Sequence, residues 1–151
     1  MRIVSSAFED NGYIPIKYSK QGGNISPPLE FIDVSAGVKS LALVCHDPDA
    51  PVSGGFTHWL VWGFKPEPSE ILENELPSGV VQGLNDWGTH NWDGPQPPNG
   101  THRYIFYLYA IDINLDLSSE AKRPDLLQAI DGHVIDTSIL TGVFGFENTA
   151  K

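Results

Sequence analysis

The chain contains little cysteine, little positive charge and no long apolar run. Its one cysteine, Cys45, cannot form a disulfide within the chain, so folding does not require an oxidising compartment. Nine Lys and Arg residues against nineteen Asp and Glu give a net charge of −10, which argues against nucleic acid or an anionic membrane as the main partner. A small anion is not excluded, because local donors outweigh a screened net charge. The sequence shows neither a signal peptide nor a transmembrane segment, and we therefore expect a cytoplasmic protein.

Several familiar catalytic and cofactor motifs are also missing. The sequence has no P-loop, no glycine-rich dinucleotide motif and no Gly-x-Ser-x-Gly nucleophile elbow, and we expect no cofactor. A metal site is weakly indicated, since no two histidines have His-x-x-x-His spacing. We expect no metal, although ligands of the right type are available at His46, Asp47, His58, His90 and His102.

What the chain does contain is a series of short apolar segments separated by 15 glycines and 12 prolines. These segments predict strands near residues 2–8, 40–46, 56–64, 79–82, 101–112 and 138–146. The segment 124–130 predicts a helix with proline in its first turn, and the acidic stretch 66–77 predicts a loop with at most one helical turn. We expect one domain over residues 1–151, mainly β, a sandwich or barrel with a few short helices.

The stretch 94–110 joins a stiff loop to a strand. Its prolines, which include Pro97 and Pro98, fix φ and lack a backbone donor, so the first half is neither a helix nor a central strand. The second half is rich in aromatic residues and predicts a strand in which His102 and Tyr104 share one face. An apolar row that ends in histidine and tyrosine beside a proline loop predicts the wall of a pocket.

Alternation places polar residues at the end of three such apolar rows. In the strand 40–46 the row leads to Asp47, and in the strand 56–64 we expect His58 to share a face with Leu60 and Trp62. If the first strand pairs antiparallel with the other two, the polar ends meet at one edge of the core, where they satisfy one another. The residues that would meet are Asp47, His58, His102 and Tyr104.

Such a cluster suits the binding of a small anion. A carboxylate beside imidazoles raises their pKa values and holds one of them as imidazolium. Histidine donors and a tyrosine hydroxyl then bind phosphate or carboxylate. In this interpretation Asp47 fixes the histidines, Pro97 and Pro98 shape the rim, and Trp59 or Trp87 supplies an apolar wall.

Two catalytic alternatives stay open. Cys45 with a histidine is one, but a thiol inside an apolar strand is more often structural. General acid–base hydrolysis by Asp47 and a histidine is the other.

Three ordered blocks of the sequence resemble a known family. They are Asp-Pro-Asp-Ala-Pro at 47–51, His-Trp-Leu-Val at 58–61, and Gly-Pro-Gln-Pro-Pro-Asn-Gly-Thr-His-Arg-Tyr at 94–104. Together they are similar to the signature of the phosphatidylethanolamine-binding proteins, also called Raf kinase inhibitor-like proteins. The lead-in at 14–19 and 23–29 resembles the bacterial and archaeal branch, and the match runs in order over roughly residues 8–112.

The resemblance implies a Greek-key β-sandwich with a pocket for phosphate or a phospholipid headgroup. It places the ligand-binding residues at Asp47, His58, Pro97, Pro98, His102 and Tyr104. The sequence departs from the family at Gln96, where many microbial relatives have cysteine, and at Trp62-Gly63. Its tail, 141–146, is only loosely similar to the family's, so a tail residue that closes the pocket is not assigned.

Most members of the resembled family regulate or bind rather than catalyse. We therefore expect a binding protein, not an enzyme, that acts on a partner protein such as a kinase or a protease. The alternative is a hydrolase that uses the Asp/His cluster. An exposed aromatic patch involving Phe56, Trp59, Trp62, Tyr107 and Tyr109 would support a homodimer, although core packing explains these residues equally well.

Overall fold

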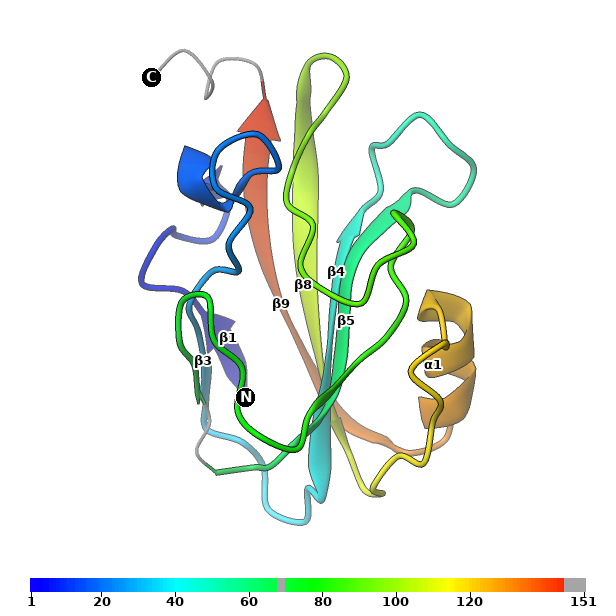
Figure 1. Ribbon diagram of the computed structural model, residues 1–151. Coiled ribbons are helices and arrows are strands. Elements are labelled where there is room, and N and C mark those ends of the chain that lie inside the picture. Colours follow the sequence, from blue (N-terminus) through cyan, green and yellow to red (C-terminus); the bar gives the residue numbers. More distant parts are fainter. Residues whose placement is uncertain (68–69, 146–151) are drawn as a thin grey trace.

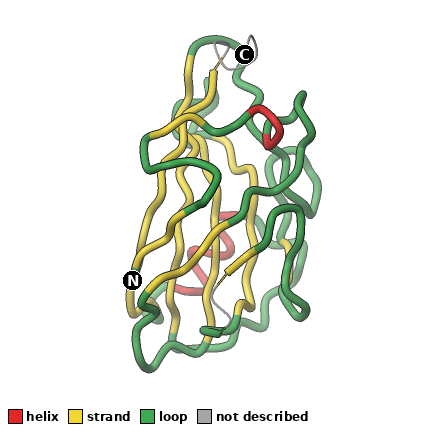
Figure 2. The backbone as a smooth tube through the Cα atoms, turned by 90° about the vertical axis from the view of Figure 1, so that its left-hand side faces the viewer, coloured by secondary structure: helices red, strands yellow, loops and turns green. Residues whose placement is uncertain are grey.

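The computed structural model describes residues 1–67 and 70–145, which form two β-sheets and two short helices (Figures 1 and 2). The larger sheet has the order β2-β9-β8-β4-β5-β7, and its neighbours are antiparallel except for β2 and β9. Its strands are β2 (Gly12–Tyr13), β4 (Ser40–Asp47), β5 (Phe56–Phe64), β7 (Val81–Gln82), β8 (Thr101–Ile111) and β9 (Val134–Gly145). The smaller sheet has the order β1-β3-β6, with β1 (Arg2–Val4), β3 (Leu29–Ile32) and β6 (Glu70–Ile71).

The large sheet is the middle layer of the molecule. The small sheet lies on one side of it and helix α1 (Arg123–Ile130) on the other, as Figure 1 shows. The short helix η1 (Ile16–Tyr18) precedes the small-sheet strand β3. All eight residues of β4 are buried, because both faces of this central strand are covered. The predicted fold class, mainly β with two sheets and short helices, is confirmed.

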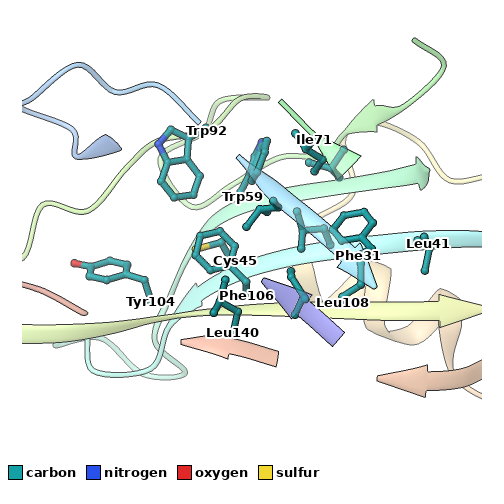
Figure 3. Close-up of a cluster of buried hydrophobic side chains, with 14 of the residues drawn as sticks. Phe31, Leu41, Cys45, Trp59, Ile71, Trp92, Tyr104, Phe106, Leu108 and Leu140 are labelled. Carbon is teal, nitrogen blue, oxygen red and sulfur yellow. The ribbon is translucent and has the colours of Figure 1, made fainter. Parts of the chain in front are cut away.

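The main hydrophobic core lies between the two sheets. Figure 3 shows part of it, with Trp59, Trp92 and Phe106 packed against the inner face of the large sheet. Trp92 stacks on Phe106 at 5.9 Å between ring centroids and meets Trp59 edge to face at 5.4 Å. A second cluster, which includes Val44 and Leu126, fills the space between the large sheet and α1.

Most predicted elements are found, and the differences lie at their ends. The strand 56–64 has the predicted bounds, and the helix begins one residue earlier than predicted. The last strand begins at Val134, four residues before the predicted start, because it pairs with β8 along its whole length. Its predicted last residue, Phe146, lies outside the described residues. The stretch 66–77 contains the short strand β6, which the loop prediction missed.

One prediction about β5 is wrong, and a β-bulge explains why. Cys45 of β4 pairs with Trp59, but the next residue, His46, pairs with Thr57. His58 is therefore an extra residue in β5 that has no partner in β4. The bulge turns His58 and Trp59 toward the same side of the sheet. Leu60 and Trp62, expected to share a face with His58, therefore pack under α1 instead.

Candidate functional site

The predicted polar residues meet at the end of the sheet where β4 ends and β5 and β8 begin, the upper end in Figure 1. They surround a cavity of about 150 Å³, called the anion pocket below. The antiparallel pairing of β4 with both β5 and β8, predicted from the sequence, is what brings them together. All six predicted site residues line this cavity: Asp47, His58, Pro97, Pro98, His102 and Tyr104. Ligand binding by these residues stays a prediction.

Asp47 holds one of the two histidines. Its Oδ2 accepts a hydrogen bond from Nδ1 of His102 at 2.6 Å, and both side chains are buried. Its Oδ1 accepts from the backbone N–H of Asp49 at 2.8 Å, which fixes the carboxylate plane. Because Nδ1 of His102 carries the proton in this bond, Nε2 is the ring nitrogen without a protein partner among the described residues.

His58 is held differently from the prediction, which gave Asp47 both histidines. Its Nδ1 donates to the backbone carbonyl of Asp93 at 2.6 Å. Burial lowers the pKa of His58, and the hydrogen bond to Asp93 and the charge of Asp47 only partly oppose this effect. The expectation of a raised pKa is therefore wrong for His58: the charge of Asp47 does raise it, but the ring is 4% exposed and desolvation dominates.

Tyr104 completes the inner wall of the anion pocket. Its ring lies edge-on to His58 with 5.2 Å between centroids, and the residue is 1% exposed. In Figure 3 its hydroxyl oxygen points away from the hydrophobic cluster. Burial and the negative charge of Asp47 raise the pKa of Tyr104 far above its usual value. The hydroxyl therefore stays protonated and remains a hydrogen-bond donor at any physiological pH.

Asp93 is a structural residue that the sequence interpretation missed. It is buried in the long loop 83–98, and its carboxylate accepts hydrogen bonds from the four side chains of Lys20, Asn24, Asn85 and Thr89. Burial raises the pKa of Asp93, but these donors together outweigh burial and lower it. A Trp-Asp-Gly sequence before the proline loop carries no signal of this role, because two of the four donors, Lys20 and Asn24, come from a distant part of the chain.

The outer wall of the anion pocket is aromatic. Phe56 and Trp87 meet edge to face at 5.3 Å, and Phe56 also contacts the ring of His58. Trp87 is 42% exposed, and the ammonium of Lys20 lies 4.4 Å from its ring centroid. Trp87 thus forms the apolar wall that the sequence predicted. Trp59, the other candidate, does not line this cavity and instead donates from Nε1 to Gln82 at 2.9 Å.

Arg103 points away from the anion pocket, as its place on the other face of β8 predicted. Its guanidinium makes two hydrogen bonds to the carboxylate of Asp49, and its backbone N–H makes a third. These bonds lower the pKa of Asp49 to about 2. The pair ties the loop that follows β4 to the start of β8 and supplies no positive charge to the cavity.

Neither Cys45 nor His46 lines the anion pocket. Asp47 and His102 meet in it, so hydrolysis by an Asp/His pair stays an open alternative. Cys45 is fully buried, and burial raises the pKa of its thiol well above the ordinary value. His46 faces the other side of β4, where its two ring nitrogens bond to Thr57 and Gly54. No group of three potential metal ligands exists within residues 1–67 and 70–145.

The aromatic residues considered for a dimer interface are mostly covered. Trp59 and Trp62 are buried, and Phe56 packs over the anion pocket. Tyr107 and Tyr109 stack with 6.2 Å between centroids and pack partly against the cluster under α1. The homodimer stays a prediction. In the described part of the chain, no helix has the length and apolar character needed to cross a membrane.

Comparisons with known proteins agree with this fold. Residues 4–145 match the family model described as phosphatidylethanolamine-binding protein. The chain is 46% identical to a UPF0098 protein of Methanothermobacter thermautotrophicus, over 95% of this chain and 98% of that protein. Among solved structures, it is similar to the phosphatidylethanolamine-binding protein homologue CT736 of Chlamydia trachomatis, with 42% identity, 95% of each chain covered and a TM-score of 0.89. It is also similar to E. coli YbcL, described as a new member of the mammalian family, with 27% identity, coverage of 96% and 98%, and a TM-score of 0.91.

Proposed function

Since the chain belongs to the phosphatidylethanolamine-binding protein family, we propose that its anion pocket binds a small oxyanion, either free phosphate or the phosphate of a phospholipid headgroup. The observation that carries the proposal is the arrangement of the two histidines. Each has Nδ1 bonded to the protein, so each has Nε2 available at a wall of the same cavity. Once protonated, these two ring nitrogens and the tyrosine hydroxyl form a set of donors suited to tetrahedral oxygens.

The charge of the site indicates that an anion binds together with a proton, which is taken up by a histidine of the site or carried by the anion. None of the residues that line the anion pocket is lysine or arginine, and Arg103 and Lys20 are engaged by Asp49 and Asp93. Positive charge at the site must therefore come from an imidazolium. A cavity of about 150 Å³ accommodates a headgroup phosphate and little more.

We also propose that the protein is not an enzyme and acts through a partner protein, such as a kinase or a protease. The cavity wall includes no serine or cysteine, so a bound ester meets no side-chain nucleophile of that kind. Because a binding site of this kind does not convert its ligand into a product, we expect its effect to be passed on through a partner protein. We place this role in the cytoplasm, because the fold is complete with a reduced, buried Cys45.

Isothermal titration calorimetry tests the binding. Phosphate and O-phosphoethanolamine are titrated into the full chain at about pH 6, where histidines begin to charge. His58→Ala is expected to weaken binding about ten- to hundredfold, the value of one hydrogen bond to a charged group. His46→Ala is the matched control, since His46 is equally buried but faces away from the cavity. No binding to the wild-type chain, or equal binding by His58→Ala, would contradict the proposal.

Two further measurements are needed. One distinguishes a lipid headgroup from free phosphate as the ligand, and the other tests whether the protein is a hydrolase. Flotation with vesicles of phosphatidylethanolamine, compared with phosphatidylcholine vesicles, distinguishes a lipid headgroup from free phosphate. A screen of esters and phosphate monoesters tests the hydrolase. Turnover that disappears in both Asp47→Ala and His58→Ala would establish the hydrolase instead of the binding protein.

A further inference from the structure

A second cavity is lined by Trp59 and Trp92, on the core side of the large sheet. Its volume is about 290 Å³, nearly twice that of the anion pocket, and the two cavities have no lining residue in common. The bulge in β5 makes this division, because His58 lines one cavity and its neighbour Trp59 lines the other. The second cavity, called the amide cavity below, is enclosed by segments near residues 24–26, 74–76 and 82 and by the 91–92 pair.

The walls of the amide cavity carry polar groups whose bonding capacity is not used. The hydroxyl of Ser26 makes no hydrogen bond within the described residues; Ser26 is 8% exposed, and its hydroxyl is not among the fully buried unpaired atoms. The side-chain amide of Asn74 makes none either. Gln82 accepts from Trp59 through Oε1, and Asn91 donates to the carbonyl of Trp92, which leaves one amide end of each without a partner in the described chain. Asn74 and Asn91 are exposed, so water reaches their amides, whereas Gln82 is half-buried.

Two tryptophans close the inner end. Trp59 and Trp92 meet edge to face, and each is held by its own indole N–H, to Gln82 and to the carbonyl of Tyr18 respectively. The apolar part of the cavity is thus rigid, whereas its polar part has both donors and acceptors free. A few polar groups converging over an aromatic floor are the usual composition of a small-molecule site.

The charges of the wall exclude most ligand classes. Its lining residues include no lysine, arginine or histidine, so an anion finds no counterion there. Glu75 is the only charged group, and it is exposed at the rim. The wall groups without a protein partner are amide nitrogens, amide oxygens and a hydroxyl, which are both donors and acceptors. A ligand with hydroxyl groups matches this mixture, because a hydroxyl both donates and accepts hydrogen bonds.

We propose that the amide cavity binds an uncharged polyhydroxylated ligand of the size of one sugar ring. The volume, close to the lower limit of about 300 Å³ for ligand pockets, accommodates a single ring and excludes longer chains. The hydroxyls pair with Ser26, Asn74 and Gln82, and the apolar C–H groups face the two indoles. The site is independent of the anion pocket and takes a ligand of a different class.

Nuclear magnetic resonance of the indole N–H groups tests the proposal, because the four tryptophans report on different places. Trp59 and Trp92 line the amide cavity, Trp87 lines the anion pocket, and Trp62 packs under α1 as an internal control. D-glucose, D-galactose and N-acetyl-D-glucosamine are added separately to the full chain at up to about 50 mM, which covers the millimolar affinity of small polar ligands. We expect one of them to shift the Trp59 and Trp92 signals saturably and to leave Trp62 and Trp87 unchanged.

Two variants make the test specific. Asn74 has φ of +56°, so Asn74→Gly removes the amide while keeping a backbone conformation that glycine adopts readily. We expect it to weaken sugar binding at least fivefold. Asn11→Gly, at φ of +66° and outside the cavity, is the matched control and should bind as wild type does.

Three results with the sugars would overturn the proposal. These are no saturable shift with any of the three sugars, an equal shift of all four indole signals, or unchanged affinity in Asn74→Gly. Ethanolamine serves as a cationic probe. A shift of Trp59 and Trp92 by ethanolamine alone, abolished in Glu75→Gln, would make the cavity an amine site and would also refute the proposal.

Discussion

Sulfate binding by the anion pocket is expected to strengthen as the pH falls from about 8 to about 5, chiefly through His58. Sulfate has no proton to gain or lose in this range, so any pH dependence belongs to the protein. In the free protein the Nδ1 proton of His58 is bonded to the carbonyl of Asp93, and Nε2 presents a lone pair to the cavity. A sulfate oxygen is repelled by that lone pair and attracted once Nε2 is protonated.

The magnitude follows from counting protons. Burial lowers the pKa of His58 in the free protein, so its ring is neutral there and takes up a proton when sulfate binds. Each proton taken up on binding changes the affinity by up to tenfold per pH unit, about 1.4 kcal/mol. The carboxylates of Asp47 and Asp93 favour this proton, whereas His46 on the neighbouring strand opposes it. Lys20 is paired with Asp93 and partly offsets the second carboxylate.

Calorimetry in two buffers of different ionisation enthalpy counts the protons directly. His58→Gln places an amide near the position of Nε2, so its pH slope should be shallower than that of the wild type by up to one power of ten per pH unit. His46→Gln should keep the full slope, because His46 bonds to Thr57 and Gly54 outside the cavity. A sulfate affinity that is flat over this range, or an unchanged slope in His58→Gln, would refute the reasoning.

Three further predictions concern stability. Because the pKa of His58 is lowered in the folded chain, the unfolded chain binds more protons, and the free energy of unfolding should fall as the pH drops below about 6.5; urea titrations at several pH values should show this fall, and it should be smaller in His58→Gln. Asp49 has a pKa of about 2 when folded, so its pairing with Arg103 stabilises the fold above about pH 3.9 and is lost as the pH falls toward 2; acid-unfolding curves of wild type and Asp49→Asn should differ above this window and converge below it. Gly94→Ala should destabilise the chain by at least the ~1–3 kcal/mol typical of overpacking, because its Cβ would lie 1.9 Å from the carbonyl oxygen of Tyr18; an unchanged urea midpoint would contradict this.

The sequence predicted the site well because alternation along β4 and β8 is regular. Asp47, His102 and Tyr104 lie where a two-residue period places them, and antiparallel pairing with β4 was the only further assumption. The same reasoning failed for β5, where the bulge before Trp59 shifts the period by one residue. His58 was nonetheless placed correctly, since it is the extra residue of the bulge and the period shifts only from Trp59 onward.

The electrostatics of the site were less accessible than its geometry. The lowered pKa of His58 depends on how completely other segments cover it, and the Asp93 network depends on Lys20 and Asn24, far away in the chain. Neither burial nor such long-range partners leave a local pattern. The amide cavity was missed for the same reason, because its polar groups come from separate loops without a shared motif.

The bonds that converge on Asp93 have a consequence for the thermodynamics of binding. The loop 83–98 has no secondary structure, yet the carboxylate of Asp93 ties it to Lys20 and Asn24 and, within the loop, to Thr89 before any ligand arrives. The conformational entropy of the loop is therefore lost during folding and not during association. A ligand with very few atoms, which gains too little contact energy to order a loop, still finds the wall and His58 in position. The anion pocket is thus preorganised for small ligands.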